Sequence, residues 1–195
     1  IIPISEGEIK MGSQTIVGYY SQENVEKLTG TNSVIESLEE IAPTAMIPRL
    51  RNILGAFLFS GDDVFKPLEV LSGGERSRLA LVRLLLQPTN LLLLDEPTSH
   101  LDLSAISVLS HALREYTGTL IFTSHDEYFI EQVATHVTEV SRDQIYHYYG
   151  DWDYYLYKKS SVVDSVKLKS STRKKSGHNG NPNRDTSNDS TLSSS

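Results

Sequence analysis

The stretch "LSGGERSRLALVRLLLQPTNLLLLDEPTSHLD", residues 71–102, decides the fold class of this chain. Its four consecutive leucines predict a buried strand, because strands covered on both faces of a parallel sheet are apolar along their whole length. That strand ends in two acids, Asp95 and Glu96. The double glycine before "ERSRLALVRLLL" marks the start of a helical pattern. The stretch therefore predicts a helix followed by a strand with carboxylates at its carboxyl end.

Similar apolar runs occur on both sides of this stretch, in "TIVGYY" (Thr15–Tyr20) and "TLIFTSH" (Thr119–His125). We expect all three runs to be strands of one parallel sheet, buried on both faces. Helical spacing covers Leu103–Tyr116, and "SVIESLEEI" and "MIPRLRNILGAFLF" predict a small helical insert before residue 71. This alternation predicts an α/β fold with its ligand at the carboxyl ends of the strands.

Composition indicates a globular chain of 195 residues, with 38% hydrophobic and 22% charged residues. No apolar run reaches the roughly 18 residues of a membrane span, and the first residues lack a signal-peptide pattern, so we expect a cytoplasmic protein without membrane insertion. The absence of cysteine excludes disulfides and thiol catalysis.

The last 35 residues differ from the rest in composition. Residues 161–195 contain six Lys/Arg and three Asp/Glu, a net charge of +3, so the preceding 160 residues carry −10 of the total −7. Ten serines and no aromatic residue predict a disordered tail. Its basic cluster around residues 167–175 is either a solvated run, which such composition favours, or a contact for RNA phosphates.

Asp95 and Glu96 are candidate catalytic acids. Two adjacent carboxylates at a strand end can divide the work of phosphoryl transfer, one facing Mg²⁺ and the other polarising a water. The alternative is a solvated strand end followed by a turn at Pro97.

The "LSGGE" segment is a candidate anion site. Ser72 and Glu75 have the spacing of a capping box, which by itself explains both residues. The capping box does not explain Gly73 and Gly74, which let a phosphate approach backbone N–H groups at the positive end of a helix.

His125 ends the third predicted strand. The other histidines, and a histidine at a strand end in general, are more often structural hydrogen-bonding groups. If its strand neighbours that of Asp95, however, the imidazole lies beside the carboxylates and can contact a terminal phosphate or the attacking water.

Together these motifs resemble those of an ABC ATPase. "LSGGE", "LLLLDEPTSHLD" and "TSHD" are similar to the signature motif, the Walker B motif with its D-loop, and the switch histidine, and "VGYYSQE" resembles the Q-loop. The strings "DEPTSHLD", "TSHDEYFIEQVATHV" and "YYGDWDYYLYKK" resemble the ABC-F family, tandem-domain ATPases that act on ribosomes. The chain looks more like the second ATPase domain of that family than the first.

The resemblance implies a role for each site residue. Gln22 would sense Mg²⁺ and water, Asp95 would hold Mg²⁺ through water, Glu96 would be the catalytic base with His125 beside it, and Asp102 would lie in the D-loop. The signature residues, Ser72 to Glu75, would contact ATP held by a second ABC domain. The implied partners are that domain and the ribosome with its rRNA.

One ABC motif is missing from this sequence. A Walker A loop needs G-x-x-x-x-G-K-[ST] to cradle phosphates, yet none of the twelve glycines precedes a lysine. We therefore expect a partial ABC domain over residues 1–160, with a helical signature subdomain at about 24–86, a parallel sheet core and the tail at 161–195. The isolated chain is expected to be inactive, although the complete protein would hydrolyse ATP.

Two other functions remain open from sequence. A transporter's nucleotide-binding domain shares the ATP motifs, although "LSGGQ" and "SALD" are more frequent there than the "LSGGE" and "SHLD" of this chain. An interaction module inert towards ATP is consistent with the missing lysine. Its tyrosine-rich segment "YHYYGDWDYYLY" either stacks on RNA bases or, as such junctions more often do, forms a strand and a packed amphipathic helix.

Overall fold

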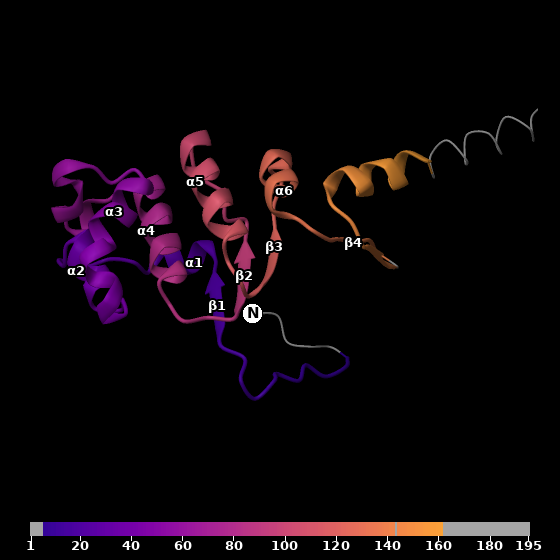
Figure 1. The fold of residues 1–195 in the computed structure, drawn as a ribbon, viewed down its shortest axis with the longest axis horizontal. Coiled ribbons are helices and arrows are strands. Elements are labelled where there is room, and N and C mark those ends of the chain that lie inside the picture. Colours follow the sequence, from indigo (N-terminus) through magenta and orange to yellow (C-terminus); the bar gives the residue numbers. More distant parts are fainter. Residues whose placement is uncertain (1–5, 143, 162–195) are drawn as a thin grey trace, which may run out of the picture. The chain divides into compact units, whose positions relative to one another are not determined.

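The computed structural model describes residues 6–142 and 144–161. These residues fall into two compact units that divide between residues 135 and 136 (Figure 1). The predicted tail at 161–195 lies outside the described residues, apart from residue 161, which is the last described residue of a helix.

A parallel sheet of three strands forms the centre of the first unit. Its strands are β1 (Val17–Tyr20), β2 (Leu91–Asp95) and β3 (Thr119–Thr123), in the order β1-β2-β3. The register pairs Tyr20 with Leu94, and Asp95 with Thr123. The three predicted strands are thus confirmed, and their carboxyl ends meet at one edge of the sheet.

Helices fill the long connection between β1 and β2 (Figure 1). They are α1 (Gln22–Glu26), α2 (Val34–Glu39), the 3-10 helix η1 (Thr44–Arg49), α3 (Leu50–Ala56), the 3-10 helices η2 (Gly61–Phe65) and η3 (Leu68–Val70), and α4 (Gly73–Leu85). After β2 come α5 (Leu103–Arg114) and, after β3, α6 (Glu127–Val133). This is the expected α/β architecture with a parallel sheet and a helical signature subdomain.

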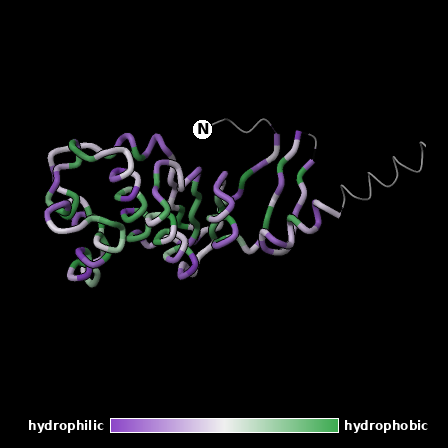
Figure 2. The backbone as a smooth tube through the Cα atoms, turned by 90° about the horizontal axis from the view of Figure 1, so that it is seen from above, coloured by the Kyte–Doolittle hydropathy of each residue, from purple (hydrophilic) through white to green (hydrophobic). Residues whose placement is uncertain are grey.

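The core lies between these helices and one face of the sheet, where hydrophobic stretches of strand and helix meet (Figure 2). Leu92 and Leu94 of β2 are 0% and 3% exposed. Gly18 of β1 pairs with Leu92. A Cβ on Gly18 would come within 2.7 Å of Leu84 Cδ1, so glycine permits α4 to pack closely on β1. Burial of this leucine-rich interface is the main stabilising contribution of the unit.

The opposite face of the sheet corrects one sequence expectation. We expected all three strands to be buried on both faces, but Val17, Tyr19 and Ile121 are 38%, 48% and 57% exposed. Leu93, between them on β2, is half-buried. The expectation was wrong because the helices of residues 6–135 pack on the face that carries Leu92 and Leu94 and leave the face of Val17, Tyr19 and Ile121 exposed.

The second unit is a hairpin with a helix. Strands β4 (Val137–Val140) and β5 (Ile145–Tyr148) pair antiparallel, and a helix covers residues 152–161. Tyr155 of that helix contacts Tyr148 of β5 edge-on, with ring centroids 4.9 Å apart, and stacks on Trp152 with the ring planes 30° apart. For these residues the interpretation of a strand followed by a packed helix holds.

Candidate functional site

The carboxyl edge of the sheet brings together polar groups from two strand ends. Thr123 Oγ1 donates to Asp95 Oδ1 at 2.8 Å and accepts from the Glu96 N–H at 3.2 Å. The same N–H also donates to the Thr123 carbonyl at 3.2 Å. Thr123 was not among the predicted site residues, although the predicted pairing of the two strands could have placed it beside Asp95.

Glu96 lies beside His125. Its Oε2 accepts from the His125 N–H at 3.3 Å, and its Oε1 lies 3.6 Å from His125 Nε2. The His125 side chain is 98% exposed, so its ring is open to a ligand. Glu96 has a φ of +48°, a left-handed conformation that is uncommon for non-glycine residues and that recurs at functional sites.

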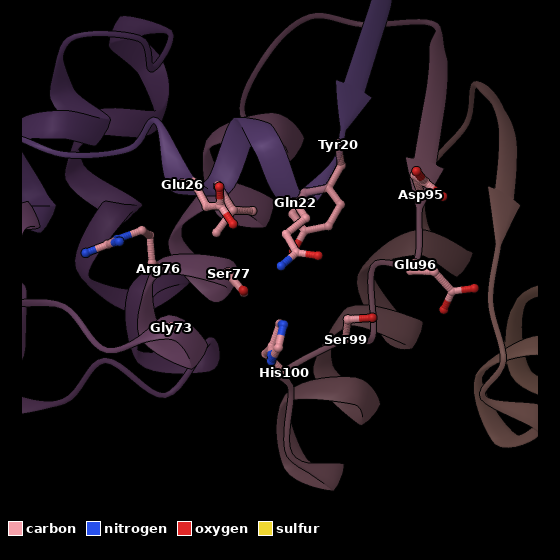
Figure 3. Close-up of a pocket in the computed structure, with 11 residues that line it drawn as sticks. Tyr20, Gln22, Glu26, Gly73, Arg76, Ser77, Asp95, Glu96, Ser99 and His100 are labelled. Atoms are coloured by element: carbon pink, nitrogen blue, oxygen red, sulfur yellow. The ribbon is translucent and has the colours of Figure 1, made fainter. Parts of the chain in front are cut away.

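A cavity of about 310 Å³ lies between this edge and the helical part (Figure 3). Asp95, Glu96, Gln22 and Gly73 are among the residues that line it. Figure 3 shows the Gln22 amide pointing into the space near Ser77 and His100, whereas the Glu96 carboxylate points away from it. Of the predicted site residues, Gln22, Gly73, Asp95 and Glu96 therefore border one cavity. His125 does not line it and contacts the Glu96 carboxylate on the side away from it.

The wall of the cavity contains a buried polar pair that sequence reasoning missed. Tyr20 and Ser77 are 5% and 2% exposed, and their side chains are hydrogen-bonded. Burial raises the pKa of the Tyr20 phenol, and the bond to Ser77 opposes that shift. The pair joins the end of β1, just before Gln22, to the first turns of α4.

The signature segment forms the N-terminus of α4. Ser72 Oγ accepts from the Glu75 N–H at 3.3 Å, and Glu75 Oε2 accepts from the Ser72 N–H at 2.8 Å, so the capping box is present. Glu75 also pairs with Lys66 at 2.9 Å, which holds the pKa of its carboxyl below the usual value. Both side chains are thus occupied locally, whereas the space where a Cβ would stand on Gly73 is open.

The predicted D-loop packs against this helix start. A Cβ on Gly74 would lie 3.1 Å from the His100 carbonyl oxygen, so the second glycine allows close backbone approach. Asp102 caps α5 by accepting from the Ala105 N–H at 2.8 Å, and its other oxygen lies 3.9 Å from Arg78 of α4. The two motifs are therefore held together by contacts within the chain.

The donor set at the edge fits Mg²⁺ only as a partial site. Asp95, Glu96 and Gln22 offer oxygen ligands, the class that Mg²⁺ takes. Within residues 6–142 and 144–161, no three His, Cys, Asp or Glu side chains form a group able to hold a metal ion. This arrangement fits an ion that keeps several waters and takes further ligands from substrate phosphates.

Comparison with known proteins relates this chain to ABC proteins. The family model described as ABC transporter matches residues 3–99. The protein YdiF of Bacillus subtilis, whose name describes it as ATP-binding, is 50% identical over 163 residues, 84% of this chain and 25% of YdiF. ABC transporter F family member 2 of Arabidopsis thaliana is 38% identical over 153 residues, 78% of this chain and 23% of the relative.

Solved structures with the same fold include an RNase-L inhibitor, with a TM-score of 0.55 and 26% identity over 70% of this chain and 27% of that one. A complex of an archaeal ribosomal stalk protein with the archaeal ribosome recycling factor aABCE1 matches with the same values. The fold and the motifs define an ABC-type ATPase domain. Within that class, the chain belongs to the ABC-F family.

The chain spans about a quarter of the length of the curated relatives that it matches. Among the described residues, no helix has both the length and the apolar character needed to cross a membrane.

Proposed function

We propose that this chain is the C-terminal part of an ABC-F ATPase, from its second ATPase domain, that couples ATP binding and hydrolysis to action on the ribosome in the cytoplasm. The observation that carries the ATPase proposal is the placement of Glu96 against His125, next to Asp95, at the edge of a cavity that the start of α4 also borders. The F family relatives and the match to a ribosome recycling factor support the ribosomal part.

Each residue has a role in the proposal. Asp95, with one oxygen bonded to Thr123, would offer the other to Mg²⁺, and the Gln22 amide would orient water in the cavity. Glu96 accepts a proton from the attacking water, and His125 steadies its carboxylate and faces the terminal phosphate. Gly73, with open space where a Cβ would stand, lets a phosphate of a partner ABC domain's ATP approach the N–H groups at the start of α4.

The sequence lacks the G-x-x-x-x-G-K-[ST] pattern that would hold the β and γ phosphates. Positioning supplies most of the catalysis in phosphoryl transfer. The isolated chain is therefore expected to hydrolyse ATP at no more than the background rate.

The test is an ATPase assay on three samples. They are the isolated chain, a chimera in which it replaces the matching segment of YdiF, and the same chimera with Glu96→Gln. The chimera should be active, and Glu96→Gln should lower turnover about 10²- to 10⁴-fold, the effect of losing a general base. Nucleotide binding should remain, because Gln keeps the shape of the side chain.

Ribosome co-sedimentation of the Glu96→Gln chimera with ATP completes the test. The variant should stay bound to ribosomes, because ATP accumulates in the closed state. If the isolated chain hydrolyses ATP and the activity depends on Glu96, the expectation that hydrolysis needs a Walker A loop is wrong. An active chimera whose trapped form ignores ribosomes would favour a transporter-like role over the ribosomal one.

A further inference from the structure

One side of the helix at residues 152–161 is exposed and has no part in the ATPase proposal. It carries Tyr154, Tyr157 and Lys158, which share a helix face because they are three and four residues apart. Tyr157 is 68% exposed and Tyr154 is 40% exposed. We call these three side chains the tyrosine face.

The tyrosine face belongs to a helix that is anchored on another side. Trp152 stacks on Tyr155 with ring centroids 5.0 Å apart, and Lys159 bonds Glu139 of β4 at 2.6 Å. These contacts hold the helix on its hairpin. The exposed tyrosines are therefore not needed for that packing.

Tyr154 is held in place by its surroundings. Its N–H donates to Asp151 Oδ1 at 2.9 Å at the helix start, and Lys158 Nζ lies 5.4 Å from its ring centroid. A Cβ on Gly150 would come within 2.6 Å of the ring, so glycine makes room for it. A ring and a cation that are already oriented lose little conformational freedom when they bind a ligand.

The charges of the two units differ. Residues 6–135 contain nine Lys/Arg and 18 Asp/Glu, a net charge of −9, whereas the described residues 136–142 and 144–161 contain three of each, a net charge of zero. The acidic first unit repels a polyanion. The described part of the second unit is neutral and does not oppose one in this way.

We propose that the tyrosine face binds single-stranded RNA. Tyr157, the more exposed ring, stacks on a base, and Lys158 contacts a neighbouring phosphate while it lies over the Tyr154 ring. Aromatic rings beside cations are the usual means of holding single strands, because every base has a face that stacks. This inference adds an RNA-binding surface to the ribosomal part of the proposed function and is independent of the ATPase part, since neither nucleotide nor the cavity takes part in it.

The test is fluorescence anisotropy of a short labelled single-stranded RNA titrated with the whole chain, without nucleotide. Tyr154→Ala combined with Tyr157→Ala should weaken binding about 5- to 150-fold, the range for the loss of one stacked base. Tyr157→Phe keeps the ring and should bind as the parent does. Lys158→Gln should reduce the slope of log affinity against log salt by about 0.7.

Leu156→Ala is the matched control, because Leu156 is 46% exposed on the same helix but has no ring. It should leave RNA affinity unchanged. Trp152 is the single tryptophan of the chain, and its fluorescence next to Tyr155 reports whether each variant keeps the helix packed. Heparin, which has anionic groups but no bases, should bind the parent and the double tyrosine variant alike.

Two outcomes would overturn the proposal. If the double tyrosine variant keeps its helix packed and binds RNA as tightly as the parent, the Lys and Arg side chains of the chain bind RNA without the tyrosine face. If the parent does not bind RNA but its association state changes with the tyrosines, the face is a protein interface. An inactive chimera in the ATPase assay would leave the RNA result intact, so the two proposals fail separately.

Discussion

At the scale of single residues, Thr123 connects the two catalytic candidates. Its hydroxyl donates to Asp95 and accepts from the Glu96 N–H, while Glu96 holds a left-handed φ. A backbone in that conformation needs support from its surroundings. Thr123 supplies part of that support from the neighbouring strand.

Thr123→Val tests this role, because valine keeps the branched shape but loses the hydroxyl. We expect the free energy of unfolding in urea to fall by about 0.5–1.5 kcal/mol, the usual net contribution of a hydrogen bond. Thr119→Val, at the other end of the same strand, removes a hydroxyl far from Asp95 and should have little effect. Equal effects of the two substitutions would contradict a special role for Thr123.

At the scale of elements, the helix at residues 152–161 is attached to its hairpin by an ion pair. Lys159 donates to Glu139 at 2.6 Å and to the Tyr155 hydroxyl at 2.8 Å. The bond from Lys159 lowers the pKa of the Glu139 carboxyl, and the same bond raises the pKa of Lys159.

These shifts predict a pH dependence with a definite sign. A carboxyl with a lowered pKa stabilises the folded state above its unfolded pKa of about 4.3, and that contribution disappears as pH falls through the lower folded value. The raised pKa of Lys159 stabilises the packed state at every pH below its unfolded value, and that contribution is lost only at strongly alkaline pH, as pH rises through the folded value. The packing should therefore weaken on acidification below about pH 4.

The measurement is Trp152 fluorescence between neutral and acidic pH. Glu139→Gln should remove most of the acid-dependent change, because glutamine has no proton to gain there. Glu131→Gln is a control, since Glu131 lies on α6 in the other unit. An unchanged acid transition in Glu139→Gln would assign the dependence to another group.

At the scale of the whole molecule, the open face of the sheet is the largest departure from an ordinary α/β domain. Parallel sheets are normally covered on both faces. Here Val17, Tyr19 and Ile121 expose apolar surface on one face. Exposed apolar patches of this kind promote association.

We expect the isolated chain to self-associate in a concentration-dependent manner, as measured by sedimentation velocity. Tyr19→Lys combined with Ile121→Lys should shift it towards the monomer without unfolding it, because both side chains point away from the core. Ser104→Lys, exposed on α5, adds a charge elsewhere and should leave association unchanged. Association that persists in the double variant would place the contact on another surface.

The fold class, the three strands and most of the candidate site follow from sequence by itself. The runs before Tyr20, Asp95 and Thr123 are short, apolar and local, so their strand character depends on neighbouring residues. The motif order likewise indicates which side chains lie at the carboxyl edge. The capping box of Ser72 is a local feature of the same kind.

Only the tertiary structure decided how these pieces meet. The bonds of Thr123 to Asp95 and of His125 to Glu96, and the approach of Gly74 to the His100 carbonyl, join residues far apart in sequence. They depend on strand register and on the packing of α4, which no local pattern encodes. The open face of the sheet is decided in the same way, because burial depends on which elements are present to cover a strand as well as on how apolar the strand is.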